Sequence, residues 1–280
     1  MAPATIAATE TATETRTLPR LFVYRSATVI ADAVAQVVHQ YVTVTDDPVL
    51  GLATGVTMDP VYAELVERYR RGSSSFDHAS FVQLDEYLGL HPGSPHRFRH
   101  SLLDRFIDPT DARPEALASP DVDDPLLDAA AAAFERRIAV RPIGLQLLGI
   151  GRNGHIGFNE PGTPFDAPTR VVPLTPDTMQ ANRRHFPSAK DMPTHAMTQG
   201  ISTIMAAHRI VLIVVGAAKQ EALTRALTGP VTPDLPASIL QRHPDVTVIA
   251  DATAAAGLDN ALGGHVSRWR CRRRRQGPPH

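Results

Sequence analysis

The sequence predicts a single three-layer α/β/α domain with a mostly parallel, Rossmann-like central sheet and a lid segment. Short, continuously apolar segments of strand length alternate with amphipathic segments of helix length. Loops with glycine and polar residues follow the apolar segments, and one long segment rich in proline and threonine interrupts the alternation. Continuous rather than alternating apolar strands are typical of parallel sheets that helices cover on both faces.

The individual elements follow from spacing along the chain. Apolar residues recur at helical spacing from Val29 onwards, which predicts a helix over residues 27–41. The other predicted helices are residues 61–69, 125–138 and 218–227. The predicted strands are residues 48–52, 81–84, 143–150, 210–215 and 246–250.

Two terminal segments differ in composition from this domain of residues 21–256. Residues 1–20 are rich in alanine, threonine and glutamate, and we expect a disordered leader because they offer little apolar surface. Residues 257–280 form a basic tail, which we also expect to be disordered. Six arginines lie in residues 267–275, so the rest of the chain carries a charge of −7 against −1 overall. An acidic body argues against a nucleic-acid partner.

The composition also restricts the class of protein. The chain has 280 residues, of which 43% are hydrophobic and 20% charged, as in ordinary globular proteins. It contains no run of eighteen apolar residues, so we expect no membrane span. The first twenty residues lack the apolar centre of a secretory signal, and the single cysteine, Cys271, cannot form an internal disulfide. We therefore expect a cytoplasmic protein.

The carboxyl ends of the predicted strands are where a parallel sheet binds ligands. Residues 161–193 show little periodicity and predict a long lid-like excursion near this edge. The loops that follow the strands begin with Thr54-Gly55-Val56-Thr57, Asp85-Glu86-Tyr87, Asn153-Gly154-His155 and Gly216-Ala217-Ala218-Lys219.

The loop of residues 54–57 lies between a strand and a helix, where free N–H groups and the helix dipole favour an anion. It is equally compatible with an ordinary turn. Lys219 and the Arg183-Arg184 pair could supply countercharges for a phosphate, or could be solvated surface residues.

Proton transfer could be performed by two groups of side chains. Asp85 and Glu86 are adjacent on a strand, so their side chains point to opposite faces, and each could be a general base or a helix cap. His155 and Glu160 could form a proton-transferring pair or a structural one. The histidines show neither HxxxH nor HExxH spacing, so we expect no metal site.

The segment Gly149-Ile150-Gly151-Arg152-Asn153-Gly154 matches the dinucleotide fingerprint GxGxxG. In that motif the glycines open a helix, whereas here Pro161 follows closely and no second strand ends in an acid about twenty residues later. We therefore expect no nicotinamide cofactor, and we interpret these glycines as loop residues that bring the backbone close to a ligand.

The stretch Leu147 to Thr163, LLGIGRNGHIGFNEPGT, resembles the glucosamine-6-phosphate deaminase (isomerising) family of the glucosamine/galactosamine-6-phosphate isomerase superfamily. Shorter similarities to the same family lie at residues 50–55, 84–87, 94 and 96, 181–184, 196–198, and 237–243. Together with these shorter segments, the resemblance covers about residues 21–252.

The resemblance implies an enzyme, a hydrolase of amino-sugar catabolism. It would convert glucosamine 6-phosphate and water to fructose 6-phosphate and ammonia, by aldose–ketose isomerisation with deamination and without metal or organic cofactor. Asp85 would be the base that moves a proton between C2 and C1, and His155 would open the pyranose ring. Asn153 and Glu160 would orient His155, although some family members carry aspartate in place of Asn153.

The same resemblance assigns the phosphate to the loop of Thr54, Gly55, Val56 and Thr57, together with Arg184 and Lys219. Val56 and Met58 stand where the family usually has glycine and proline, and Pro95 where it often has tyrosine. If residue 56 needs a positive φ, Val56 would be strained.

Three alternatives stay open at this point: a 6-phosphogluconolactonase, a galactosamine-6-phosphate deaminase, and a sugar-phosphate sensor domain without catalysis. The Phe158-Asn159-Glu160-Pro161 continuation favours the deaminase over the lactonase, and the set of acid, base and histidine favours an enzyme over a sensor. The expected partner is a small sugar phosphate, with no nucleic acid and no membrane. Whether the chain forms a homo-oligomer, and whether N-acetylglucosamine 6-phosphate regulates it, stay open too.

Overall fold

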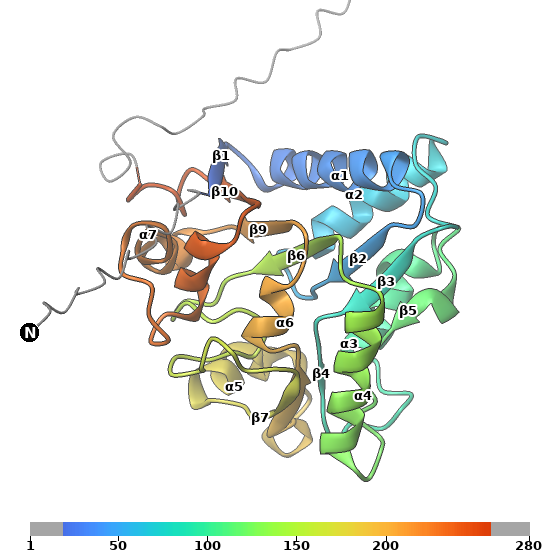
Figure 1. Ribbon diagram of the computed structural model, residues 1–280, viewed down its shortest axis with the longest axis vertical. Coiled ribbons are helices and arrows are strands. Elements are labelled where there is room, and N and C mark those ends of the chain that lie inside the picture. Colours follow the sequence, from blue (N-terminus) through green and yellow to red (C-terminus); the bar gives the residue numbers. More distant parts are fainter. Residues whose placement is uncertain (1–18, 259–280) are drawn as a thin grey trace, which may run out of the picture.

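The main sheet of the protein consists of seven parallel strands in the order β1-β10-β9-β6-β2-β3-β5 (Figure 1). The computed structural model describes residues 19–258. The strands are β1 (Arg20–Tyr24), β2 (Val49–Leu52), β3 (Ser80–Gln83), β5 (Leu117–Ala118), β6 (Leu145–Gly149), β9 (Ile210–Val214) and β10 (Val246–Asp251).

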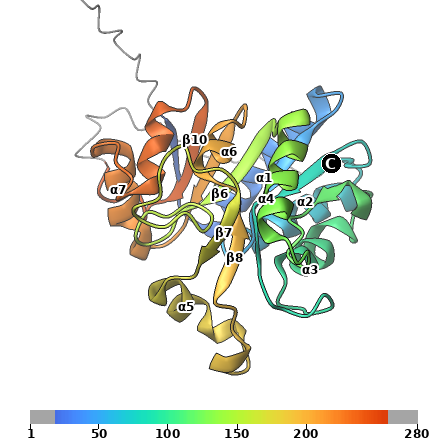
Figure 2. The ribbon, with the colours of Figure 1, turned by 60° about the horizontal axis from the view of Figure 1, so that its bottom comes forward.

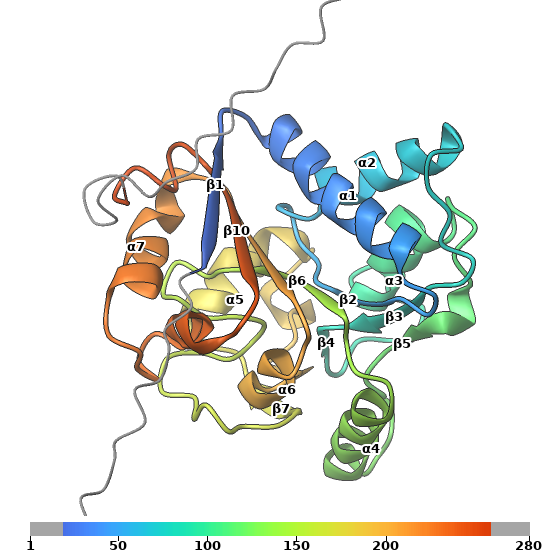
Figure 3. The ribbon, with the colours of Figure 1, turned by 45° about the horizontal axis from the view of Figure 1, so that its top comes forward.

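Helices flank this sheet on both faces, because its central strands are apolar on both sides. Every residue of β2 and β9 is buried. Helices α1 and α2 lie together over one face, and α6 lies on the opposite face (Figure 3). The helices are α1 (Ala27–Val44), α2 (Asp59–Arg70), α3 (Phe98–Leu102), α4 (Leu127–Val140), α5 (Pro176–Asn182), α6 (Ile201–Met205) and α7 (Gln220–Thr228).

Short 3₁₀ and π turns complete the chain between these elements. They are η1 (Leu103–Ile107), η2 (Pro114–Ala116), η3 (Arg183–His185), η4 (Ala189–Asp191), η5 (Ala217–Lys219) and η6 (Pro236–Arg242). Phe106 in η1 is fully buried, and its ring lies 5.0–5.6 Å from the rings of Tyr62, Phe76 and Phe81. These contacts fix α2 and η1 against strand β3, which leads towards Asp85.

A second, three-stranded antiparallel sheet was not predicted from the sequence. It pairs β4 (Asp85–Tyr87) with β8 (His195–Thr198) and β8 with β7 (Arg170–Pro173). The predicted strand of residues 81–84 ends one residue earlier, at Gln83, and residues 85–87 form a separate strand. Leu84 joins the two sheets, because its N–H donates to Leu52 O and its carbonyl accepts from Gln199 N.

The predicted lid excursion of residues 161–193 has more regular structure than its sequence suggested. It contains β7, α5, η3 and η4, and Figure 2 shows β7, β8 and α5 extending away from the seven-stranded sheet. A separate apolar cluster holds this part together: Tyr87, Phe158, Val172, Leu174, Phe186, Met192 and Ala196.

The fold class is confirmed, and the predicted helices and strands occur with shifts of a few residues at their ends. Strands β1 and β5 were not predicted, because one is only half-buried and the other has two residues. Within residues 19–258 no helix is long and apolar enough to cross a membrane. Almost all of the predicted leader, and most of the predicted basic tail including Cys271, lie outside the described residues. The predicted boundaries of the domain at residues 20 and 256 therefore stay predictions.

Candidate active site

Asp85 begins strand β4, directly beyond the carboxyl end of β3, and its side chain is buried. No described residue donates a hydrogen bond to its carboxylate. Burial raises the pKa of Asp85 to about 8, and the negative charge of Glu86 adds to the rise. A carboxylate with a pKa near neutrality and free oxygen atoms can take and return a proton.

Glu86, in contrast, is fully engaged in structure. Its carboxylate accepts hydrogen bonds from the backbone N–H groups of Tyr87, Phe98 and Arg99, at 2.8–2.9 Å, and from Gln83 Nε2 at 3.0 Å. Phe98 and Arg99 are the first residues of α3, so Glu86 caps that helix. Of the two open alternatives, cap and base, the structure makes Glu86 the cap and leaves Asp85 free.

The glycine-rich loop after β6 brings His155 to the same edge of the sheet. Gly154 has a φ of +86°, and the His155 N–H donates to Asn153 Oδ1 at 3.2 Å. A Cβ on Gly151 would lie 2.4 Å from the imidazole, so the ring needs glycine beneath it. No α-helix begins in this loop, which agrees with the interpretation of the GxGxxG match as loop geometry.

The loop also approaches Asp85 directly. Gly157 has a φ of +56°, and a Cβ at this position would lie 2.8 Å from Thr198 Oγ1 and 3.6 Å from Asp85 Oδ2. Thr198 pairs with Asp85 across β4 and β8, and its hydroxyl accepts from Phe158 N at 3.1 Å. Gly157 therefore allows the histidine loop to lie against the strand that carries Asp85.

Glu160 connects the histidine to its neighbours. Its Oε2 lies 3.4 Å from His155 Nδ1 and accepts from Asn153 Nδ2 at 2.6 Å. Its Oε1 accepts from the hydroxyls of Thr178, at 2.5 Å, and Thr175, at 3.1 Å. Burial alone would raise the pKa of Glu160, but His155, Thr178 and Asn153 together lower it to about 2. Glu160 is thus an anion at neutral pH, whereas Asn153 supplies a hydrogen bond without charge.

The two threonines belong to the first turn of the lid helix α5. Thr175 is its N-cap, and the Thr175 hydroxyl accepts from Thr178 N at 3.2 Å. The lid helix is therefore fastened to Glu160 at its amino end. Turn η3 follows at its other end and contains Arg184, whose side chain lies outside what the structure describes.

The loop of residues 54–57 forms the turn that starts α2. Gly55 has a φ of +105°, and its carbonyl accepts from Met58 N at 2.8 Å. Thr54 and Thr57 are half-buried, and Val56 is 59% exposed. The condition for strain at Val56 is not met, because no described residue other than glycine has a positive φ and Gly55 takes that conformation instead. The first N–H groups of α2 are already engaged, since those of Met58 and Asp59 donate to Gly55 O and Pro60 has none. The N–H groups of the exposed loop residues Gly55 and Val56 have no partner among the described residues, so they are the donors that could bind an anion.

Lys219 ends η5, immediately before α7, and is half-buried. Burial lowers the pKa of Lys219, and the positive charge of Arg152 lowers it further. Arg152 follows β6, the neighbour of β9, and makes no ion pair with a described residue. The sequence analysis did not propose Arg152 as a site residue. The only indication in the sequence was that it is the one arginine or lysine in the glycine-rich loop.

The predicted residues thus fall into two groups. Asn153, His155 and Glu160 are in mutual contact, and Gly157 of the same loop lies against the Asp85 carboxylate. The second group lies in the loops that follow β2 and β9, the two neighbours of β6 in the sheet. It is therefore at the same edge of the sheet as the His155 loop, which follows β6. Its members are Thr54, Gly55, Val56, Thr57 and Lys219. Among residues 19–258, no three histidine, cysteine or acidic side chains are grouped as metal ligands would be.

Comparison with known proteins gives consistent relatives. The sequence model of a family described as glucosamine-6-phosphate isomerases/6-phosphogluconolactonase matches residues 25–249. The glucosamine-6-phosphate deaminase of Geobacillus sp. (strain WCH70) is 45% identical over 221 residues, which cover 79% of this chain and 88% of that protein. The enzyme of the same name from Rhodopirellula baltica is 47% identical over 212 residues, covering 75% and 84%.

Solved structures show the same relationship. A structure described as a monomeric glucosamine-6-phosphate deaminase has a TM-score of 0.83 and 38% identity, and the match covers 85% of this chain and 99% of that chain. The 6-phosphogluconolactonase of Leishmania guyanensis has a TM-score of 0.67 at 19% identity, over 86% and 98% of the chains. This second likeness shows the shared fold alone.

The raised pKa of Asp85 predicts how stability depends on pH. At pH values between the ordinary pKa of an aspartate, near 4, and the pKa of about 8 in the folded chain, Asp85 keeps its proton in the folded chain and loses it in the unfolded chain. Asp85 therefore makes the free energy of unfolding fall as the pH rises through this window. In Asp85→Asn this contribution is absent, so the variant should gain on the order of 4 kcal/mol relative to wild type between pH 5 and pH 8.5.

Urea unfolding of both proteins across that pH range measures this difference. A constant difference at all pH values would show that Asp85 does not titrate as a buried acid.

Proposed function

The chain belongs to the glucosamine-6-phosphate isomerase and 6-phosphogluconolactonase family, and from that premise we propose that it is a glucosamine-6-phosphate deaminase. It converts glucosamine 6-phosphate and water to fructose 6-phosphate and ammonia. The observation that carries this function is the buried, unpaired Asp85 carboxylate beside the loop of His155 and Glu160. Relatives at 45–47% identity carry the same name, whereas the lactonase likeness rests on fold.

Asp85 is the base of the isomerisation. In the open-chain sugar it removes the proton from C2 and returns it to C1, while one proton of the ammonium group passes to the oxygen on C1. The product is a C2 iminium, to which water adds as the C2–N bond breaks and ammonia leaves, giving the ketose. Its pKa of about 8 belongs to the empty site. A substrate ammonium group bound at C2 lowers that pKa, because an opposite charge nearby favours the ionised carboxylate. The base is therefore ionised when the substrate is in place.

His155 opens the pyranose ring. It gives a proton to the ring oxygen and takes one from the hydroxyl on C1, so that the net charge of the histidine is unchanged. The Glu160 carboxylate, 3.4 Å from Nδ1, stabilises the protonated imidazole. Asn153 holds Glu160 through Nδ2 and the backbone of His155 through Oδ1.

The phosphate of the substrate is held at the other end of the site. The Thr54–Thr57 loop offers backbone N–H groups and hydroxyls at the start of α2. Lys219, Arg184 and Arg152 supply positive charge. Binding energy from this remote phosphate orients the sugar over Asp85 and His155. Such a phosphorylated substrate does not cross a lipid bilayer unaided, so we place the enzyme in the cytoplasm with it.

Release of ammonia from glucosamine 6-phosphate by the purified chain is the direct test of this function. Asp85→Asn should lower kcat by at least about a hundredfold, because it keeps the shape of the side chain and removes the base. Galactosamine 6-phosphate and 6-phosphogluconolactone are the comparison substrates. Faster turnover of either one, or near-normal ammonia release by a folded Asp85→Asn, would contradict the assignment.

The lid contact to Glu160 should matter for turnover rather than for substrate affinity. Thr178→Val removes the hydroxyl that donates to Glu160 and keeps the side-chain volume. We expect kcat to fall about 3- to 10-fold, the effect of one hydrogen bond, with little change in KM. Thr178→Ser retains the hydroxyl and should restore kcat. A lower melting temperature with unchanged kcat would mean that Thr178 is only structural.

The cations should act on affinity instead. Lys219→Ala and Arg152→Ala are expected to raise KM about tenfold or more, while kcat changes little, since both face the phosphate and not the reacting carbons. Arg70→Ala, an exposed cation at the end of α2, is the matched control and should leave both constants unchanged. A loss of kcat at constant KM in Lys219→Ala or Arg152→Ala would remove that residue from the phosphate site.

A further inference from the structure

A cavity of about 650 Å³ lies away from the proposed active site. It reaches Val49 and Ser80, the first residues of β2 and β3, and the carboxyl-terminal half of α4. Asp85 and His155 lie beyond the opposite, carboxyl ends of the strands. A volume in this range suits a small organic ligand.

The floor of this cavity is apolar. Val49, Phe81 and Ile138 line it, and all three are at least 95% buried by the protein around them. Ala116 and Ala118 continue the apolar wall along η2 and β5. This surface can accept a ring or short hydrocarbon chain, and it gains free energy when water leaves it.

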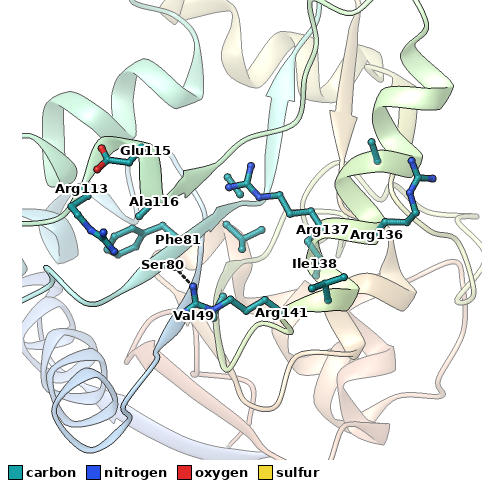
Figure 4. Close-up of a pocket in the computed structure, with 14 residues that line it drawn as sticks. Val49, Ser80, Phe81, Arg113, Glu115, Ala116, Arg136, Arg137, Ile138 and Arg141 are labelled. Atoms are coloured by element: carbon teal, nitrogen blue, oxygen red, sulfur yellow. Dashed lines mark hydrogen bonds between the residues drawn. The ribbon is translucent and has the colours of Figure 1, made fainter.

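The rim of the cavity is positively charged. Four arginines line the cavity, Arg113, Arg136, Arg137 and Arg141, and in Figure 4 the Arg136 side chain extends away from the other three. Arg141 is engaged: it donates to Ser80 Oγ at 2.6 Å and pairs with Asp47 at 3.2 Å.

Three of these four arginines, Arg113, Arg136 and Arg137, are exposed to solvent and have no described partner. Arg113 and Arg137 form no hydrogen bond or ion pair through their side chains with any described residue. The one acidic residue on the lining, Glu115, is not ion-paired with either. Like charges around one cavity repel each other, and an anion between them would remove this repulsion. Guanidinium groups are suited to phosphate and carboxylate, because they donate two parallel hydrogen bonds.

We propose that this cavity is a second binding site for a small amphipathic anion, a phosphate ester with an apolar ring or chain. The apolar body lies on Val49, Phe81 and Ile138, and the phosphate lies between Arg113 and Arg137. This site is independent of the deaminase reaction and does not use the active-site phosphate loop.

Calorimetric titration of the full chain with 1-naphthyl phosphate tests the proposal, because this probe combines an aromatic body with a dianionic phosphate. Saturating fructose 6-phosphate is present throughout to occupy the active site. Arg137→Gln and Arg113→Gln should each raise Kd at least about tenfold. Arg70→Gln is the matched control, since it makes the same charge change at an exposed arginine outside the cavity lining and should alter Kd less than about twofold.

1-Naphthol and inorganic phosphate separate the two halves of the ligand, and each should bind at least about tenfold more weakly than the ester. Four results would overturn the proposal: no binding of the ester near 1 mM, a lower Kd when the titration is repeated without fructose 6-phosphate, equal effects of Arg70→Gln and Arg137→Gln, or equal binding of 1-naphthol. Failure of the deaminase assay would leave this outcome unaffected, because the Arg113 and Arg137 variants locate the bound ester whether or not fructose 6-phosphate occupies the active site.

Discussion

The burial of one unpaired carboxylate, Asp85, is the constraint on which the proposed site depends. Removing a charged group from water without hydrogen-bond partners costs free energy, and here that cost appears as a pKa of about 8. The site can hold this group because both its neighbours are rigid: β3 lies in the buried core and β8 pairs with β4. The raised pKa places the proton exchange of this carboxyl group near neutral pH.

A neighbouring acid with the same charge has the opposite role because of its hydrogen bonds. Glu86 is also buried, yet three backbone N–H groups and Gln83 bind its oxygens. Glu160 is also held as an anion by its partners, because His155, Asn153 and the lid threonines contact its carboxylate and lower its pKa. The lid helix thus contacts Glu160 through two threonines of its first turn.

Much of the fold follows from local sequence pattern. The apolar strands at Val49, Leu145 and Ile210 and the helices between them were predictable, because burial on both faces leaves continuous apolar runs. The antiparallel sheet was not predictable, since its strands have three or four residues and are specified by pairing between residues 85–87 and residues 195–198. Such pairing depends on distant parts of the chain, and no local periodicity records it.

The sequence by itself determined the loop chemistry: glycines where the backbone must turn or approach closely, and Asp85, His155 and Glu160 at the ends of predicted strands. Only the tertiary structure decided which of the two adjacent acids has free oxygen atoms, because hydrogen bonds from α3 reach Glu86 and none from a described residue reach Asp85. It also decided that Gly55 rather than Val56 takes the positive φ. The sequence also did not indicate that Arg152 lies near enough to Lys219 to lower its pKa. Such proximity depends on which strands are neighbours in the sheet, and not on distance along the chain.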